Sequence, residues 1–273
     1  MLQPEIGWKD APRVSAGEDV IAGRRAVAEA LRAGRALHKL LVAWGVQEQG
    51  QSMQQLLAAA QQRRVPVERV DRERLAEIAG TEHQGVVALA AVRPYHSLDD
   101  LLASLEEGFA SWRSRRGGRI RGEPFLLALD EIQDPHNLGA LLRTAEAAGV
   151  DAVLITERRS AGLTPATVRA AAGAEEWLPV VRLPSLTYGL QQLKAAGLWV
   201  VGTSAEAVTT LYEADLTVPL VAVVGNEGRG MRRTVAQLCD LVVRLPMLGR
   251  VASLNASVAG GILLYEVLRQ RAK

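Results

Sequence analysis

The chain has 273 residues, 48% of them apolar and 23% charged, with a formal net charge of +2 and a sequence pI of about 8.9. This composition excludes an intrinsically disordered protein, because enough apolar surface is present to form a core. The single cysteine excludes an intrachain disulfide, the histidines show no zinc-ligand spacing, and no apolar run reaches the roughly 18 residues of a membrane span, so we expect neither a metal site nor membrane insertion.

The N-terminal residues 1–19 are polar and include Pro4, Pro12 and Gly17, which predicts a flexible arm. They hold no basic stretch followed by an apolar one, so we expect no secretory signal and a cytoplasmic location. Three further segments are expected after this arm: a small domain over 20–92, a linker over 93–122 and a larger domain over 123–273.

Residues 20–92 alternate between helical and extended patterns, which predicts a small α/β domain. Apolar periodicity predicts helices over 24–33, 52–63 and 72–79, and strands over 37–43, 65–70 and 85–92. Gly34 and Gly80 follow two of these helices, at the position where glycine commonly ends a helix. The unit also carries cationic side chains that are close together in the sequence and are able to contact several phosphates: Arg24, Arg25, Arg32, Arg35 and Lys39.

Residues 93–122 are expected to connect the two domains. Ser97 and Asp100 form a capping-box pattern, which predicts a short helix that extends toward Trp112. The arginines and glycines that follow cannot bury a core, so this part is interpreted as a solvated, flexible linker. A second interpretation, compatible with the first, is that Arg115 and Arg116 also contact phosphates.

The region from residue 123 onward has the pattern of a second α/β domain. Strands are predicted over 125–129, 152–155, 178–181, 198–201, 220–224 and 241–245, with helical stretches between most of them. Thr164 followed by Pro165 is typical of a helix start, and Gly197 of a helix end. Strands rich in valine and leucine that alternate with helices predict a parallel sheet covered on both faces.

Three segments of this second region begin where a predicted strand ends, the edge at which open α/β sheets bind ligands. In the first, residues 129–145, Asn137 opens a helix and Arg143 follows six residues later; alone, they are explained equally well by a helix cap and a surface arginine. In the second, residues 223–231, the glycine order G-x-x-G-x-G does not match a dinucleotide fingerprint or a P-loop, and by itself predicts a tight turn.

The third segment, residues 245–259, leads into a long apolar helix that Ser253, Asn255 and Ser257 open. These polar residues are interpreted either as helix caps or as part of a site in which the helix amides hold a polar ligand.

Taken together, the motifs NLGALLRTA, VVGNEGRGM and LPMLGRVASLNASVA resemble the SPOUT superfamily, specifically the TrmH/RlmB group of RNA ribose 2′-O-methyltransferases. The stretches VIAGRRAVAEALRAG, KLLVA and HQGVVA also resemble the small ribosomal-protein-like RNA-binding domain of the rRNA-directed members. The resemblance implies an α/β fold in which this small domain precedes a SPOUT-type parallel sheet with a deep trefoil knot. It also implies a homodimer formed through the C-terminal domain.

The function implied by the resemblance is 2′-O-methylation of a ribose in RNA with S-adenosyl-L-methionine as cofactor and no metal. The N-terminal domain favours a guanosine of large-subunit (23S) rRNA. Alternatives are a tRNA ribose 2′-O-methyltransferase, an rRNA-directed resistance methyltransferase and, from a different class, a catalytically silent RNA-binding protein.

The site residues implied by the resemblance fall in the three motifs. Arg143 is assigned removal of the ribose proton with help from an RNA phosphate; because a guanidinium pKa exceeds about 12, clamping of the phosphate is the alternative role. The other expected catalytic residues are Asn137, Glu227, Ser253 and Asn255. The expected cofactor-binding residues are Thr203, Gly225, Gly228, Leu245, Met247 and Leu254.

Overall fold

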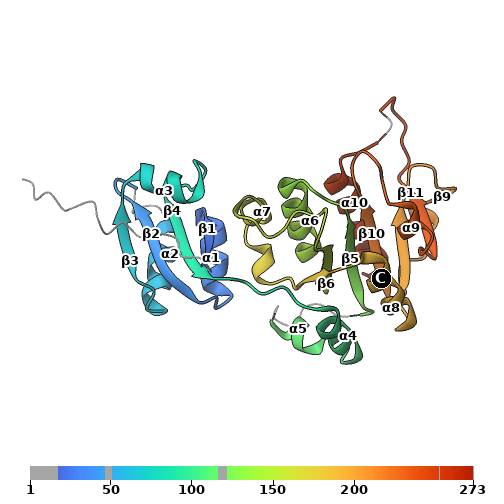
Figure 1. Ribbon diagram of the computed structural model, residues 1–273, viewed down its shortest axis with the longest axis horizontal. Helices are drawn as coiled ribbons and strands as arrows, with labels where there is room; N and C mark the ends of the chain where they lie inside the picture. The colour runs from blue at the N-terminus through green and yellow to red at the C-terminus, as the bar shows by residue number, and fades with distance from the viewer. Residues whose placement is uncertain (1–17, 47–50, 116–121, 252, 273) are drawn as a thin grey trace, which may run out of the picture.

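The computed structural model describes residues 18–46, 51–115, 122–251 and 253–272, which form two α/β domains arranged along the long axis of the molecule (Figure 1). The expected flexible arm lies outside these residues except for Glu18 and Asp19, which begin a strand. Within the described ranges, no helix combines the length and apolarity needed to span a bilayer.

The N-terminal domain is a four-stranded sheet with helices on both faces. Its elements are β1 (Glu18–Ala22), α1 (Arg24–Arg32), β2 (Leu37–Ala43), α2 (Gln51–Gln62), β3 (Val67–Val70), α3 (Arg72–Ala79) and β4 (Val86–Ala91). In the strand order β1-β4-β2-β3, β4 is antiparallel to both neighbours, while β2 and β3 are parallel. Helices α1 and α2 pack on one face and α3 on the other. All six predicted elements are confirmed; β1 has no predicted counterpart, because its five residues begin with two acids.

The connecting segment differs from the flexible linker expected over 93–122. Helices α4 (Leu98–Glu106) and α5 (Ala110–Arg115) follow the Ser97–Asp100 capping box, which is present. The side chains of Leu101, Phe109 and Trp112 are buried in a core that they share with the C-terminal sheet. Apolar residues at helical spacing therefore make this part of the segment a layer of the second domain, whereas residues 116–121, including Arg116, lie outside the described residues.

The C-terminal domain contains a seven-stranded parallel sheet. Its strands are β5 (Phe125–Asp130), β6 (Ala152–Thr156), β7 (Val180–Leu183), β8 (Trp199–Thr203), β9 (Thr209–Thr210), β10 (Leu220–Gly225) and β11 (Leu241–Arg244). Its helices are α6 (Pro135–Ala147), α7 (Pro165–Ala171), α8 (Leu186–Ala195), α9 (Arg233–Ala236) and α10 (Ala256–Arg271), with short 3₁₀ helices η1 (Ala174–Glu176) and η2 (Leu211–Glu213). The parallel arrangement is as the sequence predicts, but six strands were predicted and the two-residue β9 has no predicted counterpart.

Alternating residues of β5, β6, β8 and β10 supply two separate cores. Along β5, Leu127 and Leu129 face the layer of α6 and α10, whereas Leu126 and Ala128 face α4 and α8 (Figure 1). Burial of both faces explains why the strands are continuous apolar runs. The strand order β7-β6-β5-β10-β8-β11-β9 places the ends of β5, β10, β8 and β11 side by side, so the loops that follow them meet at one edge.

The two domains are joined by ion pairs at η1. The carboxylate of Glu176 accepts hydrogen bonds from Arg35 Nη1 at 2.6 Å and from Arg93 Nη1 at 2.7 Å. Arg35 also contacts the carboxylate of Asp19, and Val168 of α7 packs into the core of the N-terminal domain. Because Arg35 and Glu176 are largely buried, these contacts fix the place of the small domain beside η1 and α7.

Candidate active site

A chain of polar side chains crosses three of the loops that meet at the sheet edge. Asn255 Nδ2 donates to Asn137 Oδ1 at 3.0 Å, and Asn137 Nδ2 donates to Glu227 Oε1. Asn255 Oδ1 accepts from the backbone N–H of Ser257 at 2.9 Å, as the N-cap of α10. This cap fixes the orientation of the Asn255 amide, which in turn fixes that of Asn137, so the chain has a single direction and ends on the Glu227 carboxylate.

The second carboxylate oxygen of Glu227 is available to a substrate. Glu227 is exposed, and its Oε2 accepts no hydrogen bond from the described residues. A carboxylate that is oriented through one oxygen and open at the other is able to accept a hydrogen bond from a hydroxyl group.

The start of α6 is held by its own cap. Asp134 accepts a hydrogen bond from the backbone N–H of His136 at 3.1 Å. Hydrogen bonds from the Asn137 side chain and from the His136 backbone lower the pKa of Asp134. Asp134 therefore stays anionic and stabilises the helix turn that presents Asn137.

The glycine-rich loop after β10 is a tight turn, and it holds Glu227 in place. Asn226 and Gly230 exchange backbone hydrogen bonds of 3.1 and 2.8 Å, and Asn226 Nδ2 donates to the carbonyl of Glu131 at 3.0 Å. A Cβ on Gly225 would lie 2.3 Å from the Gly230 carbonyl carbon, so the loop closes on its own strand only because residue 225 is glycine.

An ion pair to a buried carboxylate, which sequence reasoning missed, anchors this loop to β5. Asp130, fully buried at the end of β5, accepts from the Arg232 backbone N–H and from Arg232 Nε, both at 2.7 Å. The pair ties the residues after Gly230 to the strand that leads into Asn137. The only sequence signal is an acid at a strand end, which also fits an exposed turn.

The residues expected to bind the cofactor occupy neighbouring strand ends. Thr203 ends β8, Gly225 ends β10 and Leu245 follows β11. β8 pairs directly with both β10 and β11, so backbone groups of the three residues are close in the sheet. A Cβ on Gly228 would meet nothing nearer than 3.8 Å, so there is space beside this residue for a ligand, while its N–H donates to Asn226 Oδ1 at 3.0 Å. Exposed Met247 and half-buried Leu254 add apolar surface. Backbone polar groups beside apolar side chains fit a nucleoside cofactor such as S-adenosyl-methionine.

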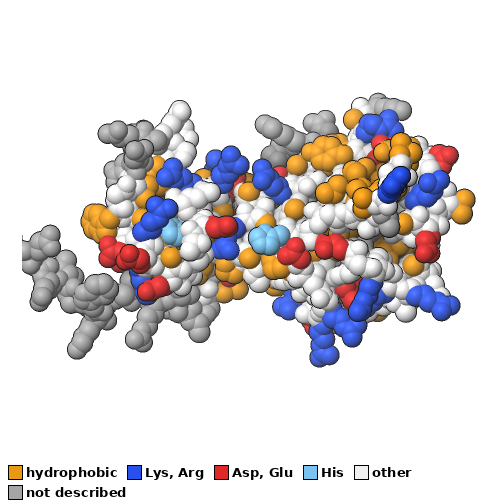
Figure 2. All heavy atoms as spheres, turned by 90° about the horizontal axis from the view of Figure 1, so that it is seen from above, with side chains coloured by type: hydrophobic (Ala, Val, Ile, Leu, Met, Phe, Trp, Pro, Cys, Tyr) orange, Lys and Arg blue, Asp and Glu red, His pale blue; other side chains and the backbone are white. Residues whose placement is uncertain are grey.

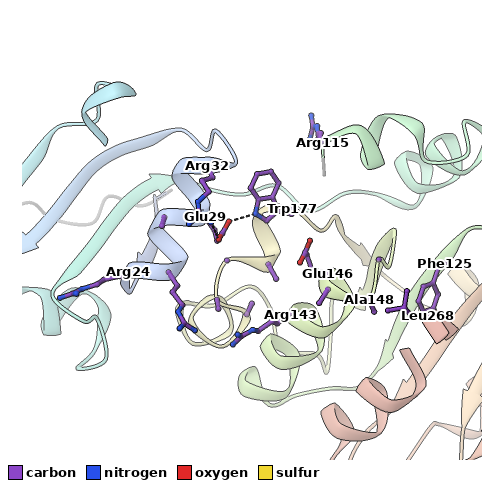
Figure 3. Close-up of a pocket in the computed structure, with 18 of the residues that line it drawn as sticks. Arg24, Glu29, Arg32, Arg115, Phe125, Arg143, Glu146, Ala148, Trp177 and Leu268 are labelled. Atoms are coloured by element: carbon purple, nitrogen blue, oxygen red, sulfur yellow. Dashed lines mark hydrogen bonds and ion pairs between the residues drawn. The ribbon is translucent and has the colours of Figure 1, made fainter. Parts of the chain in front are cut away.

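Arg143 is not part of the polar chain in its own protomer. It follows Asn137 by six residues, which on a helix is about 9 Å along the axis and about 240° around it. Its exposed side chain lines a cleft between the two domains that Asn137, Glu227 and Asn255 do not line (Figure 3). Ser253 is exposed in the loop before α10. The structure thus brings together three of the five expected catalytic residues.

The expected RNA-binding cations have different surroundings. Arg24, Arg25 and Arg32 of α1 line the cleft, as does Arg115. The guanidinium of Arg35 is instead buried in the domain junction, and Lys39 pairs with Glu68 at 2.7 Å. These two side chains are therefore already engaged within the protein.

Neither a metal centre nor a reactive thiol is found in the described part of the chain. No group of three His, Cys, Asp or Glu side chains there could hold a metal ion. Burial raises the pKa of Cys239 to about 11, which keeps its thiol protonated near neutral pH.

Comparisons with known proteins find relatives of both domains. Residues 124–265 match the SpoU rRNA Methylase family, and residues 20–96 match the domain family described as RNA 2'-O ribose methyltransferase substrate binding. A Bacillus subtilis protein classed with the TrmH family tRNA/rRNA methyltransferases is 42% identical over 94% of this chain and 98% of its own length.

Two solved structures are similar over both domains. The SpoU methyltransferase AviRb of Streptomyces viridochromogenes, in complex with AdoMet, has a TM-score of 0.74 and 27% identity, covering 94% of this chain and 92% of that one. An AdoMet-bound rRNA methyltransferase from Sinorhizobium meliloti has a TM-score of 0.72 and 26% identity, covering 93% and 87%.

Proposed function

The chain belongs to the SpoU rRNA methylase family and is an S-adenosyl-methionine-dependent RNA methyltransferase, and from this premise we propose that it methylates a ribose 2′-hydroxyl of a guanosine in 23S rRNA. The observation that carries the proposal is the hydrogen-bonded chain from Asn255 through Asn137 to Glu227, beside the strand ends that fit the cofactor. The match of residues 20–96 to a 2′-O ribose substrate-binding domain supports the ribose as the target.

The bound cofactor supplies an electrophilic methyl group on a sulfonium sulfur. A ribose hydroxyl is a weak nucleophile, so a protein group must orient it, accept its hydrogen bond and take its proton when the oxygen is methylated. In our proposal Glu227 Oε2 does so, while Asn137 and Asn255 keep the carboxylate in one orientation. Ser253, at the entrance to α10, contacts the same ribose. Positioning of this kind lowers barriers by about 7–11 kcal/mol in favourable cases.

Arg143 binds the phosphate next to the target ribose in this proposal. Its guanidinium presents a fork of donors that matches a phosphate, whereas its pKa makes it a poor base. Because Arg143 lies apart from the polar chain of its own protomer, a second copy of the protein is needed to bring an Arg143 to that chain.

A homodimer through the C-terminal domain is therefore part of the proposal. Three large apolar side chains of α10, at helical spacing, remain exposed: Val258 at 50%, Tyr265 at 50% and Leu268 at 38%. Figure 2 shows a broad area of apolar side chains on one face of the C-terminal domain, at the right of the view. Such an area on a single chain is typical of a protein–protein interface. The likeness to SpoU structures also supports the deep trefoil knot expected in this domain.

Ribosomal RNA is favoured over transfer RNA because both domains, and not the catalytic domain alone, match the rRNA methyltransferase of Sinorhizobium meliloti. The name of the Bacillus subtilis relative covers either RNA, so tRNA stays the second candidate substrate. Resistance methylation of another rRNA nucleotide is the third. We place the reaction in the cytoplasm, where ribosomes are made.

Nucleoside mass spectrometry of rRNA and tRNA, from cells with and without this gene, tests the proposal. We expect 2′-O-methylguanosine to decrease in 23S rRNA alone. A decrease confined to tRNA would select the second candidate. Unchanged methylation in both RNAs, together with calorimetry that detects no cofactor binding, would indicate a catalytically silent protein.

A further inference from the structure

The cleft between the two domains is too large for a small-molecule site. Its volume is about 1430 Å³, beyond the roughly 300–1,000 Å³ of ligand pockets. Helix α1 with Arg24 and Arg32 lies on one side of the cleft, α6 with Arg143 lies on the other, and Trp177 lies between these two helices (Figure 3). Arg25, also of α1, is among the residues that line the cleft. A cleft of this size, lined from two domains, fits a segment of a macromolecule.

The charge of the cleft favours an anionic occupant. Its described lining holds six arginines and three glutamates, the arginines being Arg24, Arg25, Arg32, Arg115, Arg143 and Arg271. Glu29 is already engaged by the side chains of Arg32 and Trp177. In contrast, exposed Arg25 and Arg143 donate no hydrogen bond and form no ion pair within the described residues. Two unpaired guanidinium groups, one from each domain, are suited to bind phosphates of one strand.

Trp177 adds an aromatic surface to these cations. It follows η1, is half-buried, and its indole N–H donates to Glu29 Oε2 at 3.1 Å. This hydrogen bond across the domain junction fixes the edge of the ring while another part of it lines the cleft (Figure 3). A fixed aromatic ring beside arginines is the arrangement on which unpaired RNA bases stack.

We propose that the cleft binds an unpaired stretch of the RNA substrate, with phosphates on Arg25 and Arg143 and one base stacked on Trp177. This inference rests on the proposed function, since it takes RNA as the substrate. Unpaired RNA is required because a base within a duplex already stacks on its neighbours and exposes no face to an indole.

The test is equilibrium binding of the full-length protein to a short, fluorescein-labelled single-stranded RNA of mixed sequence, over a range of salt concentrations. Arg25→Ala and Arg143→Ala should each weaken binding and flatten the slope of log affinity against log salt by about 0.7. Trp177→Leu should weaken binding about 5- to 150-fold with an unchanged slope, because stacking releases no counterions. Trp177→Phe, which keeps an aromatic ring, should retain most of the affinity.

Arg72→Ala is the matched control, since exposed Arg72 begins α3 on the opposite face of the N-terminal sheet; it should change neither affinity nor slope. Calorimetry with S-adenosyl-methionine should give the same affinity for every variant, which shows that each is folded. RNA binding is measured here without methyl transfer. The proposal that the cleft binds RNA can therefore be disproved while the proposed methylation stands, and the proposed methylation can be disproved while RNA binding in the cleft stands.

Three results would overturn the inference. The first is single-strand binding by Trp177→Leu equal to that of the wild type, and the second is unchanged salt slopes for both arginine variants. The third is a change in oligomeric state on size-exclusion chromatography with RNA affinity retained, which would make the cleft an interface between copies of the chain. Annealing the probe to its complement should abolish the effect of Trp177→Leu, and an equal effect on the duplex would contradict the requirement for unpaired RNA.

Discussion

The polar chain at the sheet edge and the cleft between the domains are built in opposite ways. In the polar chain, Asn255, Asn137 and Glu227 are oriented by hydrogen bonds that begin at a helix N-terminus. In the cleft, Arg25 and Arg143 have no partner within the described residues. The difference indicates that side chains are held in one orientation where the methyl group is transferred, and that arginines are left unpaired where a flexible RNA strand must be accommodated.

The largest effect is expected from Glu227→Gln. The amide oxygen can still accept the hydrogen bond from Asn137, but the second carboxylate oxygen is then replaced by an NH2 group, which donates and cannot accept from the ribose hydroxyl. Methyl transfer at saturating RNA should fall about 100- to 10,000-fold, with little change in cofactor affinity. Single-turnover transfer from radiolabelled cofactor measures the rate, and calorimetry measures the affinity. Wild-type rates in this variant would show that the polar chain has no chemical role.

Arg143→Ala should lower transfer about 100- to 1,000-fold, because a donor to the phosphate beside the reacting ribose is lost. Cofactor affinity should be nearly unchanged, since Arg143 lies away from the strand ends of β8, β10 and β11. Arg143→Lys, which keeps the charge without the forked geometry, should recover only part of the rate. A loss of cofactor binding with transfer retained at saturation would instead place Arg143 in the cofactor site.

The junction beneath the cleft makes stability depend on pH. Burial, together with neighbouring Glu176, raises the pKa of Glu175 to about 7 from 4.5. Between these values the folded protein keeps a proton that the unfolded chain releases, so the free energy of unfolding falls as pH rises and levels off above pH 7.

Glu175→Gln is neutral at every pH and lacks this dependence. It should unfold in urea with a free energy about 3 kcal/mol above that of the wild type at pH 8, and the difference should disappear near pH 4. A difference that did not change with pH would show that burial of Glu175 is not the cause.

The smallest effect is expected from Asp130→Asn. It weakens the two hydrogen bonds from Arg232, whose side chain is 39% exposed, so the loss of stability should be about 2 kcal/mol. Since the pair anchors the loop of Gly225 and Glu227, cofactor affinity should fall with it. Thr217→Ala is a matched control. The exposed hydroxyl of Thr217 is bonded only to Asp215 among the described residues, so its loss should leave cofactor affinity unchanged.

The polar chain was within reach of the sequence, whereas the cleft was not. Asn137, Glu227 and Asn255 each follow a predicted parallel strand, and the ends of such strands meet at one edge. Trp177 gave no local signal, because its role depends on Glu29, 148 residues away in another domain. Arg35 was expected to contact RNA because the sequence shows a cation near other cations. The sequence does not show its distant partner, Glu176, which engages the guanidinium in an ion pair. Similarly, Asp130 and Arg232 are 102 residues apart.

Methyl transfer to unmodified 23S rRNA, followed by alkaline hydrolysis, tests directly whether the ribose is the target. Alkali cleaves RNA through the 2′-hydroxyl, so a 2′-O-methyl group leaves one linkage uncut. We expect the label from the cofactor in a single alkali-resistant dinucleotide that begins with 2′-O-methylguanosine, and its loss with Glu227→Gln. Label recovered in a base-methylated nucleotide, or transferred only to tRNA, would contradict the assignment.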